Sequence, residues 1–232
     1  KQGTKISWVI HLLPYLEEQS LFDQFDLKKN ILQQAGNPQS TELPILHCAS
    51  DEATGRQFVS PASPVPFTKA NYAAFVSAFH LDSSWQGAIS RKGRKLSEVT
   101  DGQSKSLLFG EIRTRAHQAD PRGVWALPWP GSSLLAIDFH DVADASGVDI
   151  AQTPNTLAPD VLFFCPEPAA ALLEGMPCHD QWQQYISDAP RSKHSGGVNV
   201  AFLDGRVEFL PDDIEPRTMA LMVAVNDGLI HE

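Results

Sequence analysis

The order of hydrophobic and polar positions predicts a helix near the N-terminus. Between Ile6 and Asp26 the apolar side chains recur at roughly helical spacing; they are Trp8, Leu12, Tyr15, Leu16, Phe22 and Phe25. Pro14 lacks a backbone N–H donor, and proline is best accommodated in the first turn of a helix. We therefore expect a helix from about Leu13 to Phe25 that turns its aromatic stripe toward the core.

Short apolar runs in the middle of the chain predict strands. Three of them are Leu43–Gly55, Asn71–Phe79 and Gly102–Ile112. The aromatic run Gly123–Gly131 is limited by prolines, which favours an edge strand. The stretch Val59–Phe67 is rich in proline and serine, so it predicts an extended surface loop.

A hairpin is predicted in the segment HSGGVNVAFLDGRVEF, residues 194–209. Apolar side chains alternate on both sides of its centre, at Val198, Val200 and Phe202 and again at Val207 and Phe209. Asp204 and Gly205 lie between the two runs. An Asp-Gly pair is typical of a two-residue type I′ turn, in which both residues need a positive φ.

The C-terminal segment Asp212–Gly228 predicts a helix, with Asp213 as its N-cap, Pro216 in its first turn and Gly228 at its end. About 55 residues before the hairpin, 136–190, are poorly patterned and predict a large irregular insertion. The order of elements favours an α+β fold with a mainly antiparallel sheet. We expect one domain over residues 1–232.

The composition of the chain limits the classes of binding partner that we expect. The chain has 28 acidic and 18 basic residues and a net charge of -10, so its surface repels phosphate backbones and nucleic-acid binding is not expected. No apolar run approaches the roughly 18 residues that cross a bilayer. The opening residues KQGTKISW are typical of a chain entered midway, so we expect a further segment ahead of Lys1.

The three cysteines contain no CxxC pair, which disfavours a zinc knuckle. Cys165 and Cys178 enclose a short loop rich in proline, and a disulfide between them would remove loop entropy worth about 3 kcal/mol. Such a bridge suits an oxidising compartment; two unpaired thiols in a reduced one are the alternative. Cys48 is then the odd cysteine, expected to be buried unless it pairs outside this chain.

Sequence motifs for common catalytic machinery are absent. The chain has no GxSxG, GxxxxGK[ST], GxGxxG or HExxH pattern. The sequence therefore does not predict the nucleophile elbow of an α/β-hydrolase, a phosphate-binding loop or the zinc-binding helix of a metalloprotease. We therefore expect a protein that is not an enzyme.

An acidic stretch offers oxygen ligands for calcium. Asp138, Asp141, Asp144 and Asp149 lie close together, with His140 among them. Their spacing does not fit the EF-hand pattern, and a solvated acidic loop is the simpler interpretation. We expect no cofactor other than calcium at this stretch.

Trp125 and Trp129 share one short proline-rich segment. If they are exposed, their rings would stack on sugars; packing in the core or at a sheet edge is the alternative.

His194 and Asp204 bracket one strand of the hairpin, with nine residues between them. An extended chain separates such residues by roughly 30 Å, so a direct His–Asp contact is not expected. We expect Asp204 to support the turn and His194 to hydrogen-bond a loop at the base of the hairpin.

The spacing from His194 to Asp204 and Gly205 resembles the H-x9-DG signature of the DUF1559 family of prepilin-type proteins. Three other segments resemble family patterns in the same order; they are SWVIHLLPYLEEQSLFDQFD (7–26), LHCASDEATG (46–55) and TDGQSKSLLFGE (100–111). The chain departs from the usual family residues at Ala49, Lys105, Ser106, Ser195 and Arg206.

This resemblance implies a pilin-like fold, in which a long N-terminal helix packs on an antiparallel sheet. It also implies a prepilin-type cleavage signal and an apolar helix that tethers an extracytoplasmic domain to the membrane. Partners would be other pilin-like subunits or secretion machinery. The resemblance supplies structural motif residues but no catalytic one; these are Asp101, Gly102, His194, Gly196, Gly197, Asp204 and Gly205.

Two other functions stay open at the level of sequence. One is an extracellular carbohydrate-binding module that uses Trp125, Trp129 and residues 136–190. The other is a metal-dependent hydrolase that uses His140 or His194 with nearby aspartates.

Overall fold

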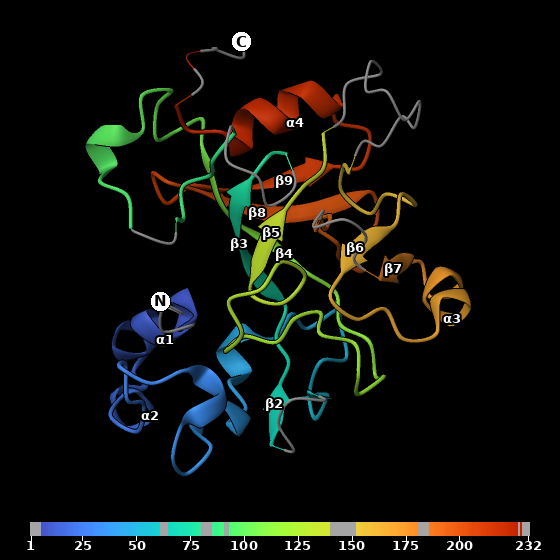
Figure 1. Ribbon diagram of the computed structural model, residues 1–232. Helices are drawn as coiled ribbons and strands as arrows, with labels where there is room; N and C mark the ends of the chain where they lie inside the picture. The colour runs from blue at the N-terminus through green and yellow to red at the C-terminus, as the bar shows by residue number, and fades with distance from the viewer. Residues whose placement is uncertain are drawn as a thin grey trace.

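A five-stranded sheet forms the centre of the protein (Figure 1). The computed structural model describes residues 6–60, 65–79, 85–90, 93–139, 152–180, 186–226 and 228. The strand order is β5-β3-β4-β8-β9, with bounds Tyr72–Ser77 (β3), Leu107–Glu111 (β4), Leu134–Ala136 (β5), Gly197–Phe202 (β8) and Val207–Pro211 (β9). Neighbouring strands are antiparallel except β5, which runs parallel to β3. The predicted α+β class is confirmed.

One face of this sheet is covered by the helix α4, Pro216–Val223. Its apolar side chains pack against alternate strand residues that include Phe75, Val198 and Val200. The N-cap is Glu215, whose carboxylate accepts the backbone N–H groups of residues 217 and 218, so the prediction of Asp213 was wrong. The helix also ends at Val223 rather than at Gly228, because Ala224 is already extended.

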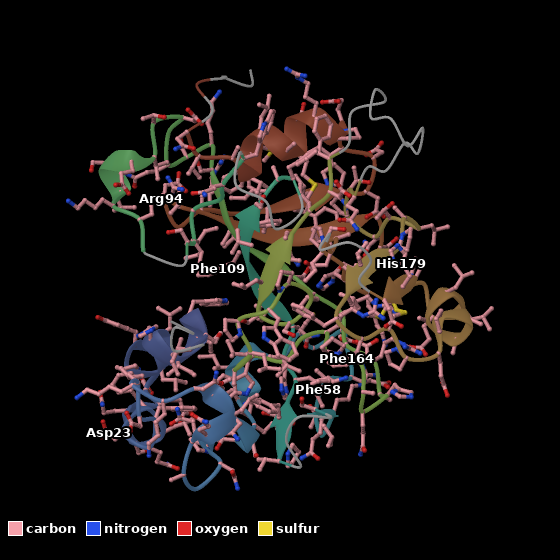
Figure 2. All side chains as sticks on the ribbon, in the orientation of Figure 1. Asp23, Phe58, Arg94, Phe109, Phe164 and His179 are labelled. Atoms are coloured by element: carbon pink, nitrogen blue, oxygen red, sulfur yellow. A yellow bond between two sulfur atoms is a disulfide. The ribbon has the colours of Figure 1, made fainter. Side chains whose placement is uncertain are left out.

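The opposite side of the sheet carries a set of apolar residues that we call the open face: Trp8, Tyr72, Phe109, Ala201, Val207 and Phe209. Cross-strand register places the strand members on one side, since Ala74 pairs with Phe109, Phe109 with Ala201, and Ala201 with Val207. Phe109, labelled in Figure 2, lies between the sheet and α1, where the Trp8 ring stacks on it at 4.4 Å. Toward β9, Val207 stays 66% exposed and Phe209 49%.

The N-terminal segment does not form the single helix that we expected. It divides into α1 (Trp8–Leu12), a 3-10 turn (Leu13–Leu16) and α2 (Gln19–Phe22). Glu17 takes a left-handed conformation with φ 63°, which ends the 3-10 turn Leu13–Leu16 and changes the direction of the chain before α2. Tyr15 is 83% exposed, so only part of the predicted stripe is buried.

This N-terminal segment packs in a second core that also contains Phe58 and Phe67. These residues belong to the two-stranded sheet β1 (Gln57–Val59) and β2 (Pro66–Thr68), which flanks the predicted proline-rich loop. The remaining 3-10 helices are Ile31–Gln33, Pro38–Ser40, Pro44–Leu46 and Leu96–Glu98.

Two predicted strands are not formed. The apolar run that begins at Leu43 folds into the 3-10 turn Pro44–Leu46, where Pro44 sets the first helical residue. In the aromatic run, Val124 makes only an isolated bridge with Lys69, because prolines at 128 and 130 remove ladder donors.

The described part of the predicted insertion has regular structure of its own. It contains β6 (Asp160–Leu162), α3 (Pro168–Leu173) and β7 (Cys178–Asp180), with β6 and β7 parallel. Figure 1 shows this unit at the side of the central sheet. Among the helices of the described residues, none is both long and apolar enough to cross a membrane.

Candidate functional site

Three segments that are distant in the sequence bring polar side chains together at one end of the central sheet. Cys48 lies in the loop after the 3-10 turn Pro44–Leu46, Glu111 is the last residue of β4, and His194 precedes β8 by three positions. We call these three residues the thiol cluster. Each of them comes from a different segment of the family resemblance.

The thiol cluster converges on one imidazole nitrogen. His194 Nε2 lies 3.0 Å from Glu111 Oε1 and 3.5 Å from Cys48 Sγ. One donor atom from each residue fits within a span of 4.8 Å. Cys48 is 9% exposed and Glu111 2%, while the His194 side chain is 30% exposed.

The expected contact of His194 with a loop is present, because Cys48 lies in the loop after Pro44–Leu46. The ring also contacts the carboxylate of Glu111 at the end of β4, which was not expected. Cys48 is buried and unpaired within this chain, as predicted.

A second set of contacts holds the cluster in place. The backbone N–H of Asn199 donates to Glu111 Oε2 at 2.7 Å, and its side-chain amide lies 3.3 Å from both carboxylate oxygens. On the other side, the Cys48 N–H donates to Asn71 Oδ1 at 3.0 Å. The Asn71 amide in turn donates to Asp51 Oδ2 at 2.7 Å.

Asp51 is a buried carboxylate that is well supplied with donors. It accepts the backbone N–H and the hydroxyl of Thr114 at 3.0 and 3.1 Å, and it pairs with Arg56 at 3.4 Å and Lys193 at 3.6 Å. Burial would raise the pKa of Asp51, but the hydrogen bonds from Thr114 and Asn71 and the charge of Arg56 lower it below its ordinary value. Asp51 therefore anchors the loop that carries Cys48.

Geometry decides what the thiol cluster can do chemically. A Cys–His–acid proton relay needs one ring nitrogen against the thiol and the other against the carboxylate. Here both partners contact Nε2, and among the described residues no group lies at hydrogen-bonding distance of Nδ1. The arrangement instead gathers a sulfur, a carboxylate oxygen and a ring nitrogen within 4.8 Å of one another.

The two glycines after His194 have different reasons to be glycine. Gly196 has φ 86°, a left-handed conformation that side chains disfavour. A Cβ on Gly197 would lie 2.2 Å from the Leu210 carbonyl oxygen and 2.8 Å from the Phe209 ring. Gly196 therefore permits the turn between His194 and β8, whereas Gly197 permits the close approach of β8 to β9.

The far end of the family signature is a tight turn without contact to the thiol cluster. The Gly205 N–H donates to the Phe202 carbonyl at 3.0 Å, and the Phe202 N–H to the Arg206 carbonyl at 2.8 Å. Only Gly205 has a positive φ, so the loop has three residues, a type I turn followed by a left-handed glycine. The predicted two-residue type I′ turn was wrong. Asp204 does support the turn, since its carboxylate accepts the Arg206 N–H at 3.0 Å.

The predicted motif residues Asp101 and Gly102 lie next to this turn. The Leu203 N–H donates to the Ser106 carbonyl at 3.0 Å, which joins the turn to the loop before β4. Asp101 Oδ1 accepts the Gly228 N–H at 3.3 Å. A surface cavity of about 390 Å³ lies here, lined by Thr100, Asp101, Gly102, Ser104, Lys105 and Gly228.

The two candidate tryptophans have different environments. Trp125 is fully buried, and its Nε1 donates to Thr68 Oγ1 at 2.8 Å, so it offers no face to a sugar and the alternative of core packing is confirmed for it. Trp129 is partly buried against the second core, with Phe58 at 6.4 Å and Phe163 at 5.2 Å between ring centroids.

The predicted calcium site is described only in part. Asp138 is 5% exposed, and its backbone N–H donates to Gln152 Oε1 at 2.8 Å. Asp141, Asp144, Asp149 and His140 lie outside the described residues.

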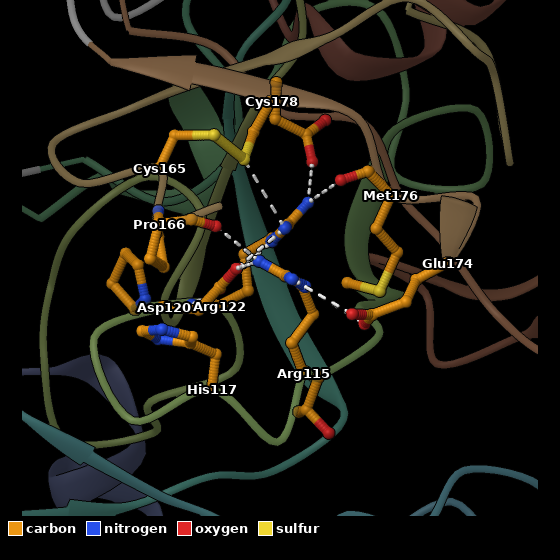
Figure 3. Close-up of polar contacts among 12 residues, drawn as sticks. Arg115, His117, Asp120, Arg122, Cys165, Pro166, Glu174, Met176 and Cys178 are labelled. Carbon is orange, nitrogen blue, oxygen red and sulfur yellow. Dashed lines mark hydrogen bonds and ion pairs between the residues drawn. A yellow bond between two sulfur atoms is a disulfide. The ribbon is translucent and has the colours of Figure 1, made fainter. Parts of the chain in front are cut away.

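Cys165 and Cys178 form the predicted disulfide. It encloses α3 and borders a largely buried set of ion pairs that we call the charge network: Arg115, Asp120, Arg122, Asp160, Glu174 and Arg191. Figure 3 shows Arg115, Asp120, Arg122 and Glu174 beside the disulfide. Arg122 contacts Asp120 at 2.7 Å and Asp160 at 2.8 Å, and Asp160 also pairs with Arg191 at 2.9 Å. The composition gave no signal for this network, because the six residues are scattered over the sequence.

Ionisation in the charge network follows its pairing. Burial would raise the pKa of Asp120, but the charge and hydrogen bonds of Arg122 outweigh it and lower the pKa to about 2. Nearby Lys69, which donates to the Arg115 carbonyl at 2.7 Å, has its pKa lowered to about 8 by burial. Burial and the charge of Asp160 raise the pKa of Asp188 well above its ordinary value.

Comparison with known families identifies the family of this chain. Residues 1–217 match the family model SBP_bac_10, described as Protein of unknown function (DUF1559). Searches of curated proteins and of solved structures found no significant match.

Proposed function

Because the chain belongs to the DUF1559 family, we propose that it is a non-enzymatic, pilin-like protein of the cell envelope. In this proposal the domain faces outward, and an apolar helix N-terminal to it tethers it to the membrane. Its partners are other pilin-like subunits or secretion machinery.

The open face is the observation that carries the proposal. A pilin-like fold needs one sheet face that accepts a long helix, while α4 here covers the other face. Val207 and Phe209 leave apolar surface exposed along β9. Trp8 already packs on Phe109, so a helix entering from the N-terminal side would continue over the same face.

The chemistry of the described residues supports a role without catalysis. In the thiol cluster the thiol and the carboxylate share one ring nitrogen, which is not the geometry of an activated nucleophile. The disulfide between Cys165 and Cys178 supports an oxidising, extracytoplasmic location.

Single-cysteine labelling tests whether a helix covers the open face. Val207→Cys is compared in the isolated domain and in the membrane-tethered full-length protein, using a water-soluble maleimide. We expect the labelling rate of Val207→Cys to fall at least tenfold in the full-length protein. Unmodified protein supplies the background from the buried thiol of Cys48.

Leu173→Cys is the matched control, since Leu173 is 90% exposed on α3, away from the sheet. It should label equally in both forms. Equal labelling of Val207→Cys in the two forms would contradict the proposal. A reading frame that has no prepilin-type cleavage signal or apolar helix ahead of this chain would do so as well.

A further inference from the structure

We propose that Cys48, Glu111 and His194 bind one divalent transition-metal ion of the Zn²⁺ type. The thiolate sulfur, one carboxylate oxygen and Nε2 would be the three protein ligands. This inference is independent of the proposed pilin-like role.

The spacing of the donor atoms fits such an ion. With Zn–S near 2.3 Å and Zn–N near 2.0 Å, a tetrahedral angle puts sulfur and nitrogen about 3.5 Å apart and nitrogen and oxygen about 3.3 Å apart. The observed separations are 3.5 Å for Cys48 to His194 and 3.0 Å for His194 to Glu111. The third separation, between the Cys48 sulfur and a Glu111 oxygen, is within 4.8 Å, and a tetrahedral ion would draw these two atoms to about 3.5 Å.

The mixture of donors selects the class of metal. Calcium and magnesium take oxygen ligands, whereas a thiolate with an imidazole is typical of Zn²⁺ and similar transition metals. A deprotonated Cys48 together with Glu111 supplies two negative charges, which balance a divalent ion.

The basic side chains around the thiol cluster form ion pairs or hydrogen bonds with groups outside the cluster. Lys193 pairs with Asp51 at 3.6 Å, and Arg191 pairs with Asp160 at 2.9 Å. Arg113 donates to the Glu174 carbonyl at 3.0 Å. The position at which the three donors converge is therefore not taken by any of these cations.

Outer contacts orient the ligands as they do in metal sites. Asn199 fixes the Glu111 carboxylate through its backbone and its amide, and Asn71 fixes the backbone of Cys48. Such second contacts hold ligands at the angle that the ion requires. Three protein ligands also leave a fourth position for water or another small donor, on the side where His194 reaches solvent.

Cobalt titration of the purified chain, with its disulfide intact, tests the site. Co²⁺ reports a thiolate ligand through a sulfur-to-metal charge-transfer band. We expect one Co²⁺ per chain, a charge-transfer band that Zn²⁺ displaces, and loss of the band in Cys48→Ser. Glu111→Gln and His194→Gln should weaken binding more than the about 10- to 100-fold expected for an outer contact such as Asn199→Ala.

Two controls separate this site from general metal binding. Asp204→Asn changes the far end of the same family signature, and His179→Gln removes an exposed histidine on β7. Both should bind Co²⁺ like the unmodified chain. Absence of the band in the unmodified chain, or unchanged affinity in Cys48→Ser, would overturn the proposal.

A measurement on the unmodified chain covers the case in which a ligand variant does not fold. Zn²⁺ should slow alkylation of Cys48 by iodoacetamide at least tenfold, because a metal-bound thiolate is not free to attack. Folding of each variant is followed by circular dichroism. An alkylation rate that does not change with Zn²⁺ would also overturn the proposal.

Discussion

The protein holds two polar clusters whose members are mostly buried, and their side chains are paired in different ways. In the charge network every partner is of opposite sign, as in the contacts of Arg122 with Asp120 and Asp160. In the thiol cluster three side chains that can all donate electron pairs meet at one nitrogen, with no lysine or arginine among them. The first arrangement is complete within the chain, whereas the second has the form of a site for a cation.

The difference also shows in what surrounds each cluster. The charge network joins the disulfide-bonded unit of β6, α3 and β7 to the segment around Arg115 and Arg122 (Figure 3). The thiol cluster lies at the end of the central sheet, where His194 is in part exposed. Buried ion pairs whose charges are matched favour one arrangement of the chain. Donor atoms that are partly exposed can instead take up a water or an ion from solvent.

The largest expected effect comes from breaking the charge network. Arg122→Ala leaves Asp120 and Asp160 buried with fewer counter-charges, so the free energy of unfolding should fall by about 3–5 kcal/mol. Urea unfolding with the disulfide intact measures this loss. Lys29→Ala, which removes an exposed pair with Asp26, should cost less than about 1 kcal/mol. Equal losses in the two variants would contradict this ranking.

Acid should weaken the same network by an intermediate amount. The pKa of Asp120 is lowered to about 2 from 3.8, so its contribution is fully present above pH 3.8 and is lost as the pH falls toward 2. The shift corresponds to about 2 kcal/mol. Urea unfolding from pH 5 to pH 2 should show the unmodified chain losing its advantage over Asp120→Asn. If the free energy of unfolding of the unmodified chain and of Asp120→Asn depended on pH in the same way, the lowered pKa of Asp120 would be contradicted.

The smallest effect is expected in the thiol cluster without metal. Glu111→Gln keeps the shape of the side chain and one oxygen for Asn199 while removing a buried charge, so metal-free unfolding should change by about 1 kcal/mol or less. Thermal and urea unfolding in the presence of a chelator measure this. A loss as large as that of Arg122→Ala would show that the cluster is a structural network like the first.

Local pattern predicted those parts of the fold that depend on near neighbours. The strands β3 and β4 and the hairpin of β8 and β9 follow from alternation and turn residues, and the spacing of Cys165 and Cys178 predicted their disulfide. The broken N-terminal helix was missed, because the left-handed Glu17 has no sequence signal comparable to glycine. The edge strand predicted around Val124 was replaced by packing in the second core.

Of the three residues in the thiol cluster, the sequence analysis singled out only His194 as a candidate site residue. His194 was expected to bond a loop at the base of the hairpin, but Cys48 and Glu111 were not named as its partners. Asp204 was expected to support the turn, and it does. A usable signal did exist, since the family segments LHCASDEATG and TDGQSKSLLFGE carry Cys48 and Glu111. Each of three family segments carries one residue of a type that binds metals, and this pattern could have indicated that Cys48, Glu111 and His194 belong to one site.

By itself the sequence determined the class of the fold, the family, the disulfide and the hairpin that carries the family signature. The tertiary structure alone decided that Cys48, 146 positions before His194, and Glu111, 83 positions before it, meet on one ring nitrogen. The physical reason is that periodicity reports contacts within a helix or strand, whereas sheet register and loop anchoring by Asp51 set contacts between distant segments.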